Sequence, residues 1–212
     1  MCNKKIIVFM GPSLSIKEAQ KILHADYRPP AKRNDILNVM YENPDIIGLI
    51  DGVFHQSPAV SHKEILRAID NQIVVVGGSS MGALRAAELD GLGMIGIGYI
   101  YQQYANGNIE SDDDVALAFT SNDYIPLSVP YVNIEYNLNQ AEKENIITNN
   151  EKKRILTVAK SIHYPKRSYP TVLDRVDIDL KTKNRLKEFL KTGVDIKKQD
   201  AIEVLNYIKN LI

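Results

Sequence analysis

The sequence predicts an α/β fold with a Rossmann-like, three-layer arrangement: a parallel sheet flanked by helices, followed by a helical C-terminal portion. Two observations support this prediction. The first half of the chain contains short β-branched runs that are apolar throughout rather than alternating, as in strands buried on both faces. Helical patterns separate these runs, as connections between parallel strands require. We expect an α/β core over residues 1–122, with about four or five strands, and a helical region over residues 123–212.

Four apolar runs supply the expected strands, and a fifth segment is extended. The apolar runs span residues 5–10, 45–51, 72–78 and 93–98. The extended segment spans residues 25–33, where two prolines disfavour a helix and restrict Arg28 to extended geometry. Ser15 and Glu18 form a capping box that begins the first helix. Helical patterns follow the five segments at about residues 15–23, 34–41, 61–70, 81–89 and 99–107.

The composition excludes several classes of protein. The 212 residues have a formal net charge of zero, which gives no indication of nucleic-acid binding. No apolar run approaches the ~20 residues needed to cross a bilayer, so we expect no membrane partner. Cys2 is the single cysteine, which excludes a cysteine metal cluster and fits a cytoplasmic location.

Small and polar residues follow the expected strands. Because ligands bind at the carboxyl ends of parallel strands, these residues are candidates for a site. Ser13 follows the first strand and Asp51 ends the 45–51 strand. The next strand leads into residues 78–82, GSSMG, which satisfy the G-x-S-x-G pattern of a serine nucleophile on a tight strand-to-helix turn. This pattern favours Ser80 as the nucleophile, with Ser79 as its neighbour or with the two roles exchanged.

Other groups could complete an acyl-transfer site at this edge. His55 or His62 could act as the base, and Asp51 could orient a histidine or a substrate amine. Backbone N–H groups at the start of the following helix could stabilise an oxyanion. The residues that we expect to bind substrate are Gly77, Gly78, Gly82, Lys63, Arg28, Ser13 and Arg85.

Non-catalytic interpretations of the same residues stay open. A glycine-rich turn of this kind more often binds a phosphate or carboxylate than performs chemistry, although it matches neither a Walker loop nor a dinucleotide fingerprint. Ser61 and Glu64 could simply cap the helix that starts at His62. The acidic residues 112–114 are better explained as a helix N-terminus than as a metal site.

Several longer motifs resemble the TfuA-like family. The resemblance is close over about residues 6–132 and looser beyond them. The motifs are GPSL (11–14), YRPPA (27–31), IDGVFHQSPAVSHKEILRAID (50–70), GGSSMGALRAAELDGLGMIGIGYIYQQY (77–104) and DDDVALAF (112–119).

The resemblance implies a role in peptide backbone thioamidation beside a YcaO protein. The chain would hydrolyse the C-terminal thiocarboxylate of a ubiquitin-like sulfur-carrier protein, release sulfide, and help the YcaO to engage its substrate. That substrate would resemble methyl-coenzyme M reductase or a ribosomally made precursor peptide. ATP and Mg would be used by the YcaO, so the chain would need no cofactor of its own. The site residues carried over from the matched motifs are Ser79, Ser80, Asp51, His55, His62 and Lys63.

Two other functions compete with this one. The chain could be a non-catalytic adaptor that bridges the YcaO, the carrier and the substrate, with the glycine-rich turn gripping a carboxylate. It could also be a small-molecule deacylase unrelated to sulfur, which the order of the motifs disfavours. The basic helices near the C-terminus, including Lys197 and Lys198, are candidates for the surface that contacts the YcaO or the carrier.

Overall fold

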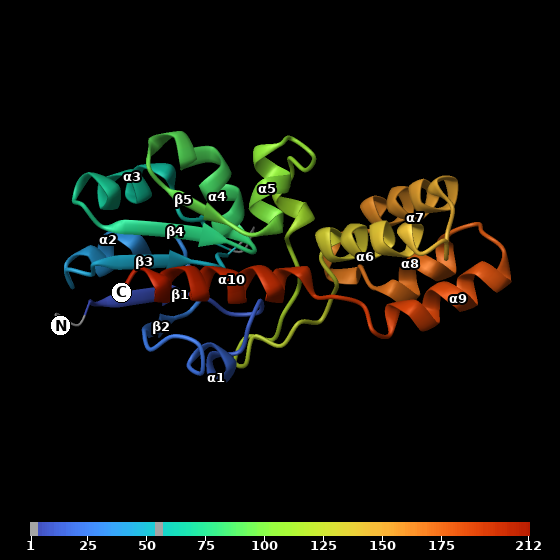
Figure 1. Cartoon of the computed structure of the whole chain (residues 1–212), viewed down its shortest axis with the longest axis horizontal. Helices are drawn as coiled ribbons and strands as arrows, with labels where there is room; N and C mark the ends of the chain where they lie inside the picture. Colours follow the sequence, from blue (N-terminus) through green and yellow to red (C-terminus); the bar gives the residue numbers. More distant parts are fainter. Residues whose placement is uncertain (1–3, 54–56) are drawn as a thin grey trace. The chain divides into compact units, whose positions relative to one another are not determined.

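A five-stranded parallel sheet lies at the centre of the first of two structural units (Figure 1). The computed structural model describes residues 4–53 and 57–212. Every neighbouring pair of strands is parallel, which confirms the predicted sheet. The strands are β1 (Ile6–Phe9), β2 (Asp26–Arg28), β3 (Ile46–Leu49), β4 (Val74–Gly78) and β5 (Ile95–Ile97), and their order in the sheet is β2-β1-β3-β4-β5.

Helices cover both faces of this sheet, which gives the expected three layers (Figure 1). One face is covered by α2 (Asp35–Met40), α3 (His62–Asp70) and α4 (Met81–Leu89). The other is covered by α1 (Ile16–Ala19) and α10 (Ile196–Asn210). A fifth strand-following helix, α5 (Tyr99–Ala105), packs against α4.

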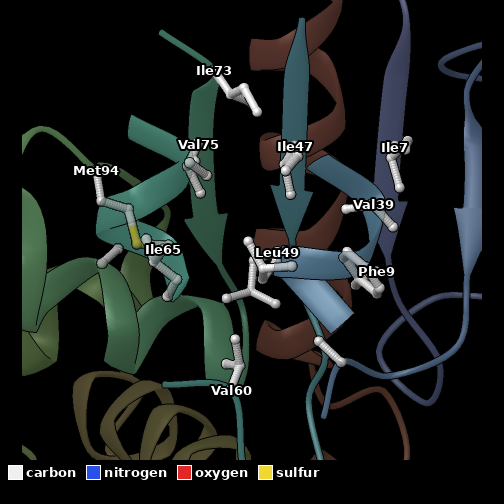
Figure 2. Packing of buried hydrophobic residues seen from close by; sticks show 14 of the residues in the cluster. Ile7, Phe9, Val39, Ile47, Leu49, Val60, Ile65, Ile73, Val75 and Met94 are labelled. Atoms are coloured by element: carbon white, nitrogen blue, oxygen red, sulfur yellow. The ribbon is translucent and has the colours of Figure 1, made fainter. Parts of the chain in front are cut away.

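Strands β1, β3 and β4 are apolar throughout because each contributes to a hydrophobic cluster on either side of the sheet. Ile7 and Phe9 of β1 belong to the cluster under α2, α3 and α4, and the alternate residues of β1 belong to the cluster under α10. Figure 2 shows Ile47, Leu49 and Val75 on the neighbouring strands within the first cluster. Because both faces of the sheet are buried, polar and apolar residues do not alternate along these strands.

The last helix completes the first unit from the far end of the chain. This unit comprises Met1–Asp112 and Lys197–Ile212, whereas the second comprises Asp113–Ile196. Val204, Leu205 and Ile208 of α10 are fully buried in the second sheet-face cluster. The α10 helix therefore forms one layer of the α/β unit.

One expectation about this helix is wrong. Lys197 was expected on a partner-contacting surface, but it is 2% exposed at the start of α10. Its chain position places it where α10 begins to pack on the sheet, so its side chain is buried. Lys198 is part-exposed, and its Nζ lies 2.6 Å from a carboxylate oxygen of Glu18.

The second unit contains four α-helices among its described residues. Their apolar faces meet in a separate cluster that includes Ile134, Ile155 and Leu186. Arg167 is fully buried beside this cluster and is held by the carbonyls of Ala159 and Ile162. The four helices are α6 (Tyr131–Lys143), α7 (Asn149–Ser161), α8 (Tyr169–Arg175) and α9 (Leu180–Leu190).

The acidic residues at the start of this unit are used in ion pairs. Asp113 pairs with the buried Arg167, and Asp114 pairs with Lys160. Over residues 4–53 and 57–212, no group of histidine, cysteine and acidic side chains could hold a metal ion. None of the described helices is long and apolar enough to span a bilayer.

Candidate functional site

A buried polar network lies at the carboxyl ends of β1, β3 and β4. Asp51 follows β3 and is 1% exposed. Its carboxylate accepts hydrogen bonds from the Gly11 N–H (2.8 Å), the Ser13 N–H (3.1 Å) and the Ser13 hydroxyl (2.7 Å). These three donors compensate the carboxylate for its loss of water. Asp51 therefore fixes the loop that follows β1.

Ser79 joins this network from the end of β4. Its Oγ lies 3.0 Å from the Ser13 Oγ and 2.8 Å from the carbonyl oxygen of Lys197 in α10. The single hydroxyl proton can be donated to only one of these acceptors at a time. The side chain is fully buried, and the Ser80 N–H closes a three-residue turn around it by bonding the Gly78 carbonyl at 2.9 Å. Ser79 thus links three segments of the unit.

The backbone of Ser79 is in the left-handed region, with φ of 67°. This conformation costs a residue with a side chain about 1–2 kcal/mol. Non-glycine residues keep such a conformation where the surrounding structure fixes it, which occurs most often at functional turns. Ser79 is therefore the strained residue of this strand-to-helix turn. The G-x-S-x-G pattern predicts that strain at Ser80, whose φ is −120°.

Ser80 has a different environment from Ser79. It is the N-cap residue of α4 and is 1% exposed, but its side chain makes no capping hydrogen bond. Within the described part of the chain, its hydroxyl has no hydrogen-bond partner. It lies at the positive end of the helix, where the Met81 N–H bonds no carbonyl in the described part of the chain and is available to an anion. Of the two adjacent hydroxyls, only that of Ser80 is left for a ligand.

The glycines of this turn allow α4 to pack directly against the strands. A Cβ atom at Gly82 would lie 1.7 Å from the Leu49 carbonyl oxygen. At Gly77 it would lie 2.4 Å from the Gly82 carbonyl oxygen, and at Gly78 it would lie 2.4 Å from the Ile97 carbonyl oxygen. Close packing explains glycine at all three positions, and their predicted contact with substrate stays a prediction.

Of the two histidines predicted as bases, the structure describes His62, which has no hydrogen bond to either serine. His55 lies outside the described residues. His62 is part-exposed at the start of α3, and its Nε2 lies 2.8 Å from a carboxylate oxygen of Glu88. The same oxygen lies 2.6 Å from the Arg85 guanidinium, whose Nε also donates to the Val60 carbonyl at 2.9 Å. His62, Arg85 and Glu88 thus form a second polar group on α3 and α4.

Two other predicted binding residues lie apart from both polar groups. Lys63 is exposed on the first turn of α3. Arg28 is at the end of β2, where its guanidinium pairs with the carboxylates of Asp26 and Glu42. A hydrogen bond with Asp26 raises the pKa of Arg28 above its ordinary value.

A pocket of about 380 Å³ runs along the outer face of α4. It begins at Met81, the residue after Ser80, and continues past Leu84 and Arg85 to Glu88, which share one helix face by their spacing. Its other walls come from two loop segments. The full lining is Ser57, Ala59, Met81, Leu84, Arg85, Glu88, Glu110, Ser111 and Asp112.

Two buried carboxylates were not predicted as part of the site. Asp200 on α10 accepts hydrogen bonds from the N–H groups of Tyr99 (2.9 Å) and Ile100 (2.7 Å), and so caps α5. Burial raises its pKa to about 7. The sequence signal was Gly98, which holds the N-cap position of α5 without a capping side chain.

Glu64 was assigned to a capping box, and its Oε1 does accept from the Ser61 N–H at 2.6 Å. Its Oε2 is buried and has no hydrogen-bond partner among residues 4–53 and 57–212.

Comparison with known proteins identifies the family of this chain. A family model described as TfuA-like protein matches residues 51–168, which is more than half of the chain. The match begins at Asp51 and includes both serines, His62 and the whole pocket lining. No characterised protein matches the chain. The chain belongs to the TfuA-like family.

Proposed function

We propose that this protein acts in backbone thioamidation as a hydrolase that releases sulfide from the thiocarboxylated C-terminus of a ubiquitin-like sulfur carrier. Membership of the TfuA-like family suggests a role in thioamidation-related processes. The observation that carries the hydrolase assignment is the Ser80 hydroxyl, which lies at the start of α4 without a hydrogen-bond partner among the described residues.

The proposed reaction is an acyl transfer in two steps. The Ser80 oxygen attacks the thiocarboxylate carbon, and the C–S bond breaks as hydrosulfide leaves. Water then cleaves the resulting ester, so the carrier regains a carboxyl group and Ser80 regains its proton. The Met81 N–H at the start of α4 would stabilise the oxyanion in both steps. Sulfide would pass to a YcaO partner, which uses ATP to activate the amide oxygen of the substrate.

The base that activates Ser80 is assigned to His55. The carboxylate of Asp51 already accepts three hydrogen bonds from the loop after β1. His62 is paired with Glu88. His55 is the other histidine that the sequence predicts as a base, and it stands in the sequence between Asp51 and the pocket residue Ser57. A histidine suits proton transfer at neutral pH.

A non-catalytic adaptor is the second candidate function. The observation that favours it is that His62 and Ser79 are both occupied by contacts within the protein. In this case the start of α4 would bind the carrier's C-terminal carboxylate, and the protein would bring the carrier to the YcaO without breaking the C–S bond.

Incubation of the purified protein with a thiocarboxylated carrier, followed by measurement of free sulfide, tests the proposal. We expect Ser80→Ala to lower the rate by ~10³-fold or more, as for other serine nucleophiles. His55→Ala should cause a comparable loss, and the double variant should be little worse than either single variant because the two act together. Ser161→Ala, at an exposed hydroxyl in the second unit, is the control. Carrier binding without sulfide release by the parent protein would instead support the adaptor.

A further inference from the structure

The pocket along α4 is lined by both apolar and acidic side chains. Ala59, Met81 and Leu84 supply the apolar part. Glu88, Glu110 and Asp112 supply three carboxylates, against a single guanidinium from Arg85. That guanidinium is already bound by Glu88 and by the Val60 carbonyl. The pocket therefore offers uncompensated negative charge next to an apolar surface.

Two of its carboxylates are available to a ligand. Over residues 4–53 and 57–212, neither Glu110 nor Asp112 forms an ion pair or a hydrogen bond through its side chain. The acidic groups are not arranged as a metal site within this described part of the chain. An anion would be repelled by the same carboxylates. An organic cation is the class of ligand that this charge favours.

The apolar part of the pocket narrows the class of organic cation that it would bind. Lysine and arginine side chains combine an apolar stem with a charged head, so the stem can lie on apolar surface while the head reaches carboxylates. A pocket of about 380 Å³ is within the range that holds small ligands or single side chains. We propose that this pocket receives an arginine or lysine side chain from the C-terminal tail of the carrier protein. This inference rests on the proposed function, because that function brings such a tail to Ser80.

The length of the pocket predicts where the cation lies in the tail. The α4 face from Met81 to Glu88 advances by seven residues, or about 10 Å at 1.5 Å per residue. An extended chain advances about 3.3 Å per residue. If the terminal carbonyl carbon lies at Ser80 and the cation lies beside Glu88, at the far end of this helix face, the basic residue is about three residues before the terminal residue.

Peptide binding tests this assignment independently of catalysis. The probes are flexible nine-residue peptides with a free carboxyl terminus and one arginine, placed from two to six residues before the terminal residue. Each has a citrulline counterpart that keeps the shape and removes the charge. At low ionic strength, we expect the peptide with arginine three residues before the end to bind about tenfold more tightly than its citrulline counterpart.

Charge removal in the pocket should abolish this preference. The double variant Glu110→Gln with Asp112→Asn should bind the arginine and citrulline peptides equally. The control is Asp70→Asn, which removes an exposed acid on the last turn of α3 and should retain the tenfold preference. An unchanged preference in the double variant would overturn the inference, as would equal binding of arginine at every position. Binding of free arginine as tightly as the best peptide would overturn the assignment to a tail.

Sulfide release separates this inference from the proposed function. If the parent protein releases sulfide and the double variant has an unchanged KM for a carrier with a basic tail, the pocket assignment is wrong and the hydrolase assignment stands. If the parent releases no sulfide but keeps the arginine preference, the hydrolase assignment is wrong and the pocket assignment stands.

Discussion

Ser79 and Ser80 are adjacent in the sequence, but their hydroxyls have different partners. The Ser79 hydroxyl bonds to α10 and to the loop after β1, and it is enclosed completely. The Ser80 hydroxyl has no hydrogen-bond partner in the described part of the chain, although the residue as a whole is only 1% exposed. A buried donor that is bonded contributes to stability, whereas an unbonded one contributes little or detracts from it.

The two alanine substitutions should therefore have different effects. Ser79→Ala should mainly lower stability, and Ser80→Ala should mainly lower activity. We expect Ser79→Ala to lower the free energy of unfolding by about 1–3 kcal/mol, because it leaves buried acceptors without their donor. We expect Ser80→Ala to change it by less than about 0.5 kcal/mol. Urea denaturation followed by circular dichroism measures both values. A larger destabilisation by Ser80→Ala would mean that its hydroxyl has a structural role.

The sequence could indicate this pair of serines but could not distinguish them. The G-x-S-x-G pattern and the strand-to-helix context are local, and both serines satisfy them. The difference arises from Lys197, whose carbonyl is 118 positions away from Ser79 in the chain. Asp51 was predicted as an orienting group, but its contact with Ser13 depends on the pairing of β1 with β3 and is equally non-local.

The contact between α4 and the strands depends on the absence of side chains at the turn. Gly82 lies in the first turn of α4, where its backbone passes the Leu49 carbonyl. The Gly82 N–H also bonds the Ile50 carbonyl at 3.2 Å, so the helix start is tied to the strand next to its own. A side chain here would displace the element that carries Ser80 and the pocket face.

A matched pair of glycine substitutions tests this view of the turn. Gly82→Ala should lower the free energy of unfolding by about 3 kcal/mol or more, because the new methyl group overlaps a backbone oxygen that cannot move freely. Gly91→Ala should change it by less than about 0.5 kcal/mol or raise it slightly, because no atom lies within 4 Å of the added Cβ. Equal effects in thermal denaturation would contradict the packing account.

The regular elements of the first unit were largely predictable, because their signals are local. The apolar runs gave β1, β3, β4 and β5, and the helical patterns at 61–70 and 81–89 correspond to α3 and α4. The first helix is shorter than expected, ending at Ala19 rather than near residue 23. The packing of α10 on the sheet was not predictable, because an amphipathic pattern does not specify which surface the helix will cover.

The first unit is discontinuous in the chain, since its last layer is made by residues after the second unit. The α10 helix buries three aliphatic side chains against the sheet, bonds Ser79 and caps α5 through Asp200. Its end is also tied to the start of the chain, where the Lys4 Nζ bonds the Leu211 carbonyl at 2.7 Å.

Removal of α10 should therefore unfold the α/β unit. We expect a chain that ends at Ile196 to lose the cooperative urea transition of this unit, because one face of the sheet would be exposed to water. A chain that ends at Leu211 is the control, since it lacks only the exposed Ile212. Retention of the parent's transition midpoint by the shorter chain would show that the sheet is stable without its last layer.

The same discontinuity has a consequence for synthesis on the ribosome. The second unit is a continuous segment, so it can fold as soon as residue 196 has left the exit tunnel. The sheet must wait for the last helix, with strands that are apolar on both faces and already outside the ribosome. We expect the nascent α/β segment to be the part of this protein that chaperones bind.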